Sequence, residues 1–511
     1  MARGSKKRIA KNTLMLYCRM ILTLGVSLYT SRVVLNALGV EDYGVYNVVG
    51  GVVTMLGFFN SSIGTSTQRF LNVCMEDPSD GSMRQIFSTA VNVHAIIGIA
   101  TVLLLETIGL WFVTNKLVIP VDQYTAALWV YQCSVLSFFV SIISAPYNAA
   151  IIAYERMSVF AVFSIIEVLL KLGVAFSIKY YDGQRLILYA ILILATTVLM
   201  RFLYSGYCSR VFKEIKYKFE IKLRLIKKML SFSGWMIFGC LTDLLSTQGV
   251  NMMINIFFGP VFNAARSIAV QVQGAIAQFS NNFIMAVNPQ IVKSYAADDK
   301  DYAYKLVFSA SKLSFFLMLC LIIPITLRSS DILKLWLGIV PEYTPIFVNL
   351  ILLEYLIRSS YTPIAQINQA SGNIRLYQLS ISLLFLANFI GSYILFKTDF
   401  PVYSTFIFSA IIAFVGLFVR IMILRYQLKF PAVQYLIKVT LPLFAIASIS
   451  YFTGFCLDRM FPRTITGMIY IIALISIFNV ILIWSLGLNK SERLFIKSKL
   501  SAICTKFNHT N

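Results

Sequence analysis

Two arginines within long apolar segments could hold an anion. Arg19 and Arg266 each lie among amides and hydroxyls, and neither has an acidic residue one helical turn away. A guanidinium group presents a planar fork of donors that matches phosphate oxygens and stays charged. Charged groups inside a membrane are costly and usually face a cavity or a partner. We therefore expect these two arginines to bind a phosphate-bearing ligand.

Amides and hydroxyls form helical stripes around these arginines. In the segment 261–293, polar residues fall on one side at 100° per residue, and Ile, Val and Phe fall on the other. Three more apolar segments carry similar stripes, which predicts helices around a hydrated path. A bond to its own helix backbone is the alternative for any single hydroxyl. The predicted substrate-binding residues are Arg19, Thr23, Ser27, Ser61, Gln68, Gln248, Asn251, Arg266, Gln271, Gln278 and Asn281.

Other charges in apolar segments have different predicted roles. Asp243 and Glu106 are candidates for binding a coupling cation or proton, or for pairing with a neighbouring arginine. Arginines near segment ends are expected to extend their charge to the interface, namely Arg32, Arg201 and Arg420. Two pairs with i,i+4 spacing are expected to neutralise each other, Glu167 with Lys171 and Glu354 with Arg358.

Several functional classes are excluded by missing motifs. The sequence has no GxxxxGK[ST], HExxH or GxSxG motif, its eight cysteines form no CxxC pair, and its two histidines lie far apart. It therefore predicts no cofactor, no metal site and no enzymatic activity. The net charge of +22 comes from basic residues scattered between apolar runs, without a nucleic-acid-binding module. We expect no nucleic-acid partner.

Composition places the chain among multi-pass membrane proteins. Of its 511 residues, 58% are hydrophobic and 13% charged, and the mean hydropathy is +0.76. Apolar runs long enough to cross a bilayer predict an all-α fold with fourteen transmembrane helices. The predicted spans are 12–38, 44–68, 86–113, 123–153, 157–178, 186–208, 229–258, 262–288, 306–327, 344–368, 376–396, 402–424, 439–457 and 465–488.

The basic residues predict the orientation of these spans. On the side of the amino terminus the connecting segments hold 28 of the 44 lysines and arginines, and the opposite segments hold 8. By the positive-inside rule both termini are expected in the cytoplasm.

The order of the spans predicts two related lobes. A shift of 220 residues places Gly39 on Gly259, and a shift of 217 places Pro146 on Pro363. Six spans per lobe predict a pseudo-twofold axis along the membrane normal. The expected division is an N-terminal lobe at 1–210, a basic linker at 211–228, a C-terminal lobe at 229–428, two extra helices at 429–488 and a basic tail at 489–511. Leu494, Leu500, Ile503 and Phe507 predict an amphipathic helix in the tail.

Three stretches carry a family resemblance: the segment 11–53, SAPYNAAIIAYERM, and QVQGAIAQFSNNFIMAVNPQIVKSYA. They resemble the O-antigen-type polysaccharide biosynthesis flippases of the multidrug/oligosaccharidyl-lipid/polysaccharide exporter superfamily. The resemblance implies a bacterial inner-membrane protein that moves undecaprenyl-pyrophosphate-linked oligosaccharide to the outer leaflet by alternating access. It implies a central cationic cavity, to which Arg19 and Arg266 would contribute.

The resemblance also implies partners and leaves alternatives open. The expected partners are the lipid-linked oligosaccharide, membrane lipids, and polysaccharide polymerase and assembly proteins. A cation-coupled multidrug exporter of the same superfamily would use the same scaffold, but it should favour an acidic and aromatic cavity. A membrane-embedded polymerase or ligase would need catalytic residues with large outer loops, and the longest outer segment covers only about 328–343.

Overall fold

Helices form every regular element in the part of the chain that the structure describes. The structure is a computed structural model, and it describes residues 2–54, 56–78, 81–115, 123–220, 222–258, 260–337, 340–489 and 492–493. The all-α membrane architecture predicted from the sequence is confirmed. The amphipathic helix predicted for the tail lies outside the described residues.

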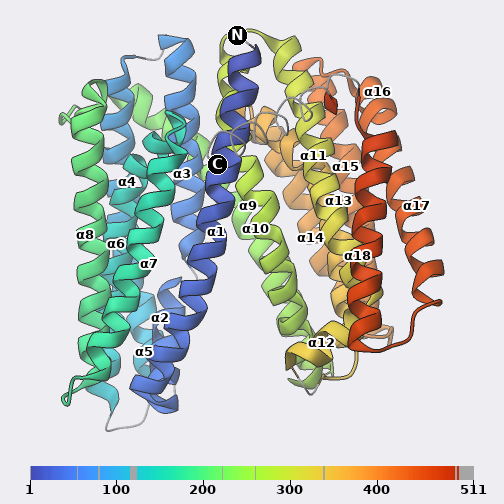
Figure 1. Cartoon of the computed structure of the whole chain (residues 1–511). Helices are drawn as coiled ribbons and strands as arrows, with labels where there is room; N and C mark the ends of the chain where they lie inside the picture. The colour runs from blue at the N-terminus through green and yellow to red at the C-terminus, as the bar shows by residue number, and fades with distance from the viewer. Residues whose placement is uncertain are drawn as a thin grey trace, which may run out of the picture. The chain divides into compact units, whose positions relative to one another are not determined.

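The chain divides into two compact units (Figure 1). Unit 1 comprises Met1–Asp243, Met285–Ala303 and Gln366–Leu379, and unit 2 comprises Leu244–Ile284, Tyr304–Ala365 and Ser380–Asn511. Five of the described helices, α9, α10, α11, α13 and α14, therefore contribute residues to both units. The lobe boundaries predicted at the linker and the pseudo-twofold axis stay predictions.

Unit 1 is built mainly from the first eight helices. These are α1 (Ala2–Leu38), α2 (Val40–Thr54), α3 (Gly57–Glu76), α4 (Met83–Leu104), a π-helical turn (Leu105–Gly109), α5 (Leu110–Asn115), α6 (Tyr124–Ala153), α7 (Met157–Lys179) and α8 (Arg185–Val211), followed by a 3-10 turn (Lys213–Ile215). Within unit 1, α6 packs against α3, α4 and α8, and α1 packs along α7.

The remaining helices begin with α9 (Leu223–Phe258) and α10 (Pro260–Ala296). They continue with α11 (Lys300–Leu327), α12 (Ser329–Leu337), α13 (Thr344–Ser371), α14 (Arg375–Lys397), α15 (Ser404–Leu428), α16 (Ala432–Tyr435), a π-helical turn (Leu436–Thr440), α17 (Leu441–Asp458), α18 (Ile465–Leu482) and a last π-helical turn (Ile483–Gly487).

Eleven helical segments among the described residues are long and apolar enough to cross a membrane. The other three predicted spans coincide with α2 and α3, with α10, and with α13. These helices carry many amides and hydroxyls, and that lowers their hydropathy. The count of fourteen spans is therefore not confirmed, although each predicted span coincides with one helix or, at 44–68, with two.

The second predicted span, 44–68, is wrong as a single helix. The structure ends α2 at Thr54 and begins α3 at Gly57, with Leu56 in a turn between them. Gly50, Gly51 and Gly57 all lie near this break. Glycine lowers helix stability by about 1 kcal/mol relative to alanine, which explains why the continuous apolar pattern does not give a continuous helix.

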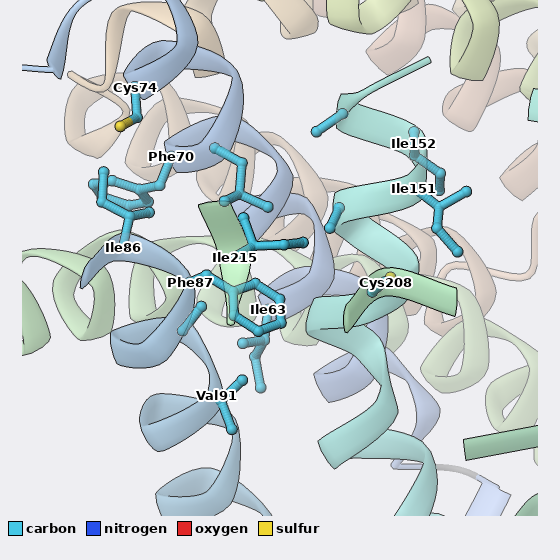
Figure 2. Packing of buried hydrophobic residues seen from close by; sticks show 14 of the residues in the cluster. Ile63, Phe70, Cys74, Ile86, Phe87, Val91, Ile151, Ile152, Cys208 and Ile215 are labelled. Carbon is cyan, nitrogen blue, oxygen red and sulfur yellow. The ribbon is translucent and has the colours of Figure 1, made fainter. Parts of the chain in front are cut away.

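Close apolar packing holds the helices of unit 1 together. Figure 2 shows part of one buried cluster, in which Ile63 and Phe70 from α3 lie near Ile86 and Phe87 from α4. Ile215 of the 3-10 turn reaches the same cluster. A second cluster joins α1, α2, α6, α7 and α8 around the fully buried Tyr131. Buried apolar residues, rather than polar contacts, thus hold these helices of unit 1 together.

Polar contacts fix the segments of α10 and α13 that belong to unit 1. Arg69 on α3 donates to the carbonyl oxygens of Gln369 at 2.6 Å and Ala370 at 3.2 Å, and thereby caps the C-terminus of α13. Glu155, in the turn after α6, accepts from Lys293 at 3.0 Å and from Gln290. The side chain of Glu155 is only 2% exposed, so this ion pair is buried.

Candidate functional site

A polar cavity of about 490 Å³ lies within unit 1. We call it cavity A. Its polar lining comes from four helices: Asn60, Ser61, Thr65 and Gln68 on α3, Ser141, Ser144 and Asn148 on α6, Glu167 on α7, and Thr197, Arg201 and Tyr204 on α8.

Helical spacing explains how each helix supplies several lining residues. On α6, Ser141, Ser144 and Asn148 recur at intervals of three and four residues, and so share one face. On α8, Thr197, Arg201 and Tyr204 recur in the same way. Small residues leave the space open: a Cβ added at Gly57 or Gly64 of α3 would meet no neighbouring atom within 4 Å.

Three buried polar atoms at cavity A have no hydrogen-bond partner among the described residues. They are Nε2 of Gln68, Oδ1 of Asn148 and one terminal nitrogen of Arg201. Buried polar groups in proteins are nearly always paired, with protein, ordered water or a ligand. Two donors and an acceptor on three different helices therefore mark cavity A as a place for a polar ligand or for water. Asn60 already donates to Ser141 at 2.9 Å.

Arg201 supplies a positive charge to cavity A. Its guanidinium carbon lies 4.1 Å from the centre of the Tyr147 ring. No carboxylate of the described residues forms an ion pair with it, and stacking leaves the edge of the guanidinium group free to donate. The sequence predicts that Arg201 extends toward the membrane interface; that prediction is wrong, because the side chain folds inward over Tyr147.

Glu167 and Lys171 form the second charged feature, 2.6 Å apart. Glu167 also lines a neighbouring cavity of about 420 Å³, here cavity B, which is bounded by α2, α6, α7 and α8 and also lined by Lys171. Ser141, Glu167 and Thr197 line both cavities. The charges that line the two cavities are thus Arg201, Lys171 and Glu167, a net positive set.

Arg19 lies near this charged set but does not line either cavity. It donates to Ser164 at 3.4 Å, and its guanidinium carbon lies 4.7 Å from the centre of the Phe160 ring. It also interacts electrostatically with Glu167. Its charge therefore adds to the positive potential around Glu167 from outside the cavity wall.

A family model described as polysaccharide biosynthesis protein matches residues 9–295, more than half of the chain. The chain belongs to the polysaccharide biosynthesis protein family. The match spans all the residues that line cavities A and B. No protein with curated annotation matches the sequence.

Solved structures with the same fold are transporters. A structure described as MATE in the bent conformation has a TM-score of 0.70 at 14% identity, over 83% of this chain and 95% of that chain. An outward-facing multidrug resistance MATE family transporter of the MOP superfamily has a TM-score of 0.69 at 13% identity, over 83% and 96%. A MOP superfamily transporter from Pyrococcus furiosus, whose description reports a binding pocket of reverse polarity, has 0.68 at 14%, over 84% and 96%. The two-lobed fold of these proteins is thus also the fold of this polysaccharide biosynthesis family member.

The structure distributes the predicted substrate-binding residues over both units. In unit 1, Ser61 and Gln68 line cavity A. Thr23 donates to the carbonyl of Met20 at 3.1 Å, so its hydroxyl is used by its own helix, while Ser27 is exposed on α1. Ser61 likewise donates to the carbonyl of Phe58 at 3.0 Å.

The other predicted residues lie in unit 2, on α9 and α10. Gln271, Gln278 and Asn281 share an exposed face of α10, as the stripe predicts, and Gln248 is exposed on α9 near the half-buried Asn251. Arg266 donates to the carbonyl of Thr247 at 2.8 Å and interacts electrostatically with Glu354. Arg266 therefore has local partners that the sequence does not indicate. The predicted binding of substrate by these residues stays a prediction.

The two coupling candidates lie apart from the cavities. Asp243 is half-buried on α9. Glu106 lies in the π-helical turn after α4 and accepts from Gln132 of α6 at 3.1 Å. Neither carboxylate lines cavity A or B.

Sequence reasoning misses most of the cavity. It places Arg201 at the interface. It correctly predicts that Glu167 pairs with Lys171, but it does not place that pair at a cavity. The signal that could locate them is the polar stripe on α6, where Ser134, Ser137, Ser141, Ser144 and Asn148 recur at three- and four-residue intervals. That stripe is as regular as the one on α10, and it faces the charged residues of α7 and α8.

Proposed function

We propose that this protein is a flippase that carries a lipid-linked oligosaccharide with an anionic phosphate or pyrophosphate group across the membrane. The observation that carries the proposal is Arg201, a cation without an ionic partner among the described residues, at a polar cavity. A sugar head group cannot cross hydrocarbon unaided, because each unpaired polar group there costs several kcal/mol. A hydrated cavity with a free arginine lowers that barrier.

Each part of cavity A fits one part of such a head group. Arg201 presents its guanidinium edge to phosphate oxygens, and Lys171 adds a second cation nearby. Gln68 and Asn148 offer an unpartnered N–H and an unpartnered carbonyl oxygen, the complementary pair that sugar hydroxyls need. The lipid tail stays in the bilayer, where it needs no protein contact.

The head group enters from the cytoplasm and leaves on the outer face of the bacterial inner membrane by alternating access, for surface polysaccharide assembly. Both termini lie in the cytoplasm, and the substrate is undecaprenyl-pyrophosphate-linked oligosaccharide. Arg19 and Arg266 attract the phosphate by their charge, and polymerase and assembly proteins receive the product.

A cation-coupled multidrug exporter is the competing function, since the solved structures with this fold include a multidrug resistance transporter. The charges that line cavities A and B argue against it, because two cations and one carboxylate repel a cationic drug.

The substrate class is tested by reconstitution. Purified protein is placed in liposomes that contain a polyprenyl-pyrophosphate-linked oligosaccharide with a fluorescent sugar, and exposure of the sugar to an external quencher is followed. A neutral glycolipid with the same sugar and no phosphate is the matched control. We expect transfer of the pyrophosphate-linked sugar at least tenfold above empty liposomes, with little transfer of the neutral lipid. Export of ethidium without glycan transfer would establish the drug exporter instead.

A further inference from the structure

The carboxylate of Glu106 lies on the outward surface of unit 1, away from cavities A and B. It accepts a hydrogen bond from Gln132 of α6 at 3.1 Å. Exposed apolar side chains lie one helical turn from each residue: Leu103 precedes Glu106 by three residues and is 62% exposed, and Leu136 follows Gln132 by four residues and is 50% exposed. A carboxylate and an amide thus lie within a lipid-facing surface. Polar groups in that position are costly and mark functional positions.

A specific local structure holds Glu106 in place. The chain forms a π-helical turn at Leu105–Gly109, and the hydroxyl of the buried Tyr131 donates to the carbonyl of Leu105 at 2.6 Å. Gly109 is required beside it, since a Cβ there would lie 2.4 Å from the Tyr131 hydroxyl oxygen. An inserted residue rotates the helix, so this turn sets the direction of Glu106 relative to α6. Single π-helical turns frequently mark functional positions.

The pair lies deeper in the membrane than the neighbouring tryptophans. Trp111 and Trp129 are exposed on the same two helical segments, four residues from the end of α5 and five from the start of α6. Exposed tryptophans are typical of the membrane interface. Glu106 lies five residues farther from the end of α5 than Trp111, and Gln132 lies three residues farther from the start of α6 than Trp129. At 1.5 Å per residue these separations are about 8 and 5 Å. The pair therefore lies on the hydrocarbon side of the tryptophans.

The pair keeps one further donor and one further acceptor, which could bond the same two groups of a second copy. Gln132 has a second N–H, and Glu106 has a second carboxylate oxygen, and neither has a partner among the described residues. Two copies related by a twofold axis could therefore exchange two hydrogen bonds, Gln132 of each donating to Glu106 of the other. Such isologous contacts are the commonest way in which identical chains associate. The flanking Leu103 and Leu136 would pack around the bonds.

We propose that the outward seam of α4 and α6, centred on Glu106 and Gln132, is a dimerisation surface for a second copy of this chain within the membrane. Exchange of hydrogen bonds across the seam satisfies groups that lipid cannot satisfy. The proposal is independent of the substrate that cavity A binds.

The oligomeric state of the full chain in liposomes tests the proposal. Each copy carries one fluorophore, and single-molecule photobleaching is measured over a series of protein-to-lipid ratios. The native protein should show two bleaching steps at protein-to-lipid ratios so low that, by chance alone, most liposomes would hold a single copy and show one step. Glu106→Gln replaces one of the two acceptor oxygens by an NH2 group, which opposes the N–H donor of Gln132, and should raise the dimer dissociation constant by about threefold or more. The double variant Glu106→Leu with Gln132→Leu should raise it at least tenfold.

Two controls separate dimerisation from folding. Ser177→Val changes an exposed polar residue on α7, outside the seam, and should leave the dimer unchanged. The unfolding temperature of each variant shows whether the double leucine variant is folded; as it removes both polar partners together, it leaves no unpaired group in the seam. A native protein that is monomeric at every density, or a folded double leucine variant that dimerises normally, would overturn the proposal.

Discussion

Arg201 lies over the ring of Tyr147, with its guanidinium carbon 4.1 Å from the ring centre. The same arrangement recurs in unit 2, where the guanidinium carbon of Arg420 lies 4.1 Å from the ring of Tyr361. The helices involved are the fourth and sixth predicted spans in one case and the tenth and twelfth in the other, as an internal repeat requires. Their surroundings differ, because Arg201 lines cavity A whereas Arg420 is 7% exposed and lines none of the described cavities.

Tyr147 should determine substrate affinity through Arg201. The ring holds the guanidinium group in place. In Tyr147→Leu the Arg201 side chain is no longer held, and its ordering when phosphate binds weakens the binding. A cation–π contact away from water contributes about 1–2 kcal/mol, so the KM for lipid-linked substrate should rise about 5- to 30-fold. Tyr147→Phe keeps the ring and should retain the native KM in the leaflet-transfer assay. Equal losses in the two variants would contradict this role.

Lys171 should bind anions more tightly when Glu167 is neutral. The two side chains are 40% and 37% exposed, so solvent screens the pair and its strength is modest, roughly 0.5–1 kcal/mol. Glu167→Gln should tighten binding of a pyrophosphate-linked sugar about two- to fivefold, and Lys171→Met should weaken it by a similar factor. Titration calorimetry on detergent-solubilised protein measures both. Weaker binding by Glu167→Gln would show that the carboxylate itself contacts the ligand.

Lys293 should stabilise unit 1 through Glu155. Since the Glu155 side chain is 2% exposed, Lys293→Met leaves a buried carboxylate that keeps the Gln290 hydrogen bond but loses the Lys293 ammonium group, and should lower the free energy of unfolding by about 3 kcal/mol. Adding Glu155→Gln removes the buried charge and should recover most of the loss. The measurement is thermal unfolding in detergent followed by intrinsic fluorescence.

The control for this prediction lies a few residues farther along the chain. Lys300 pairs with Asp298 at 2.8 Å, but their side chains are 50% and 83% exposed. Lys300→Met should therefore change the unfolding temperature very little. Equal effects of the two methionine variants would mean that burial of Glu155 does not govern its contribution.

Much of the fold follows from the sequence because the bilayer imposes a length and a polarity on each helix. The apolar runs predict a helix at every span, including α10 with its exposed polar face. The break between α2 and α3 does not follow from hydropathy, since glycines are apolar enough to continue a run while weakening the helix. The π-helical turn at Leu105 depends on Tyr131, 26 residues away, and no local pattern predicts it.

The site follows from the sequence only in part. Ser61 and Gln68 can be predicted because their helix carries an obvious stripe, and both line cavity A. The position of Arg201 at the cavity cannot be predicted in this way. Its short distance from a span end predicts that its side chain lies at the membrane interface, whereas packing over Tyr147 turns the side chain inward. The local partners of Arg266 come from α9 and α13, so sequence spacing could not reveal them. Contacts between distant segments decide which charges remain free.

Leaflet transfer by Arg201→Gln and Arg420→Gln, compared side by side, tests the central claim that Arg201 holds the phosphate group of the substrate. Both variants remove a guanidinium group from a tyrosine ring at the same distance, but only Arg201 lines cavity A. With equal amounts of folded protein in the liposomes, Arg201→Gln should reduce transfer of the pyrophosphate-linked sugar at least tenfold, and Arg420→Gln should retain most of it. Normal transfer by folded Arg201→Gln would contradict the account.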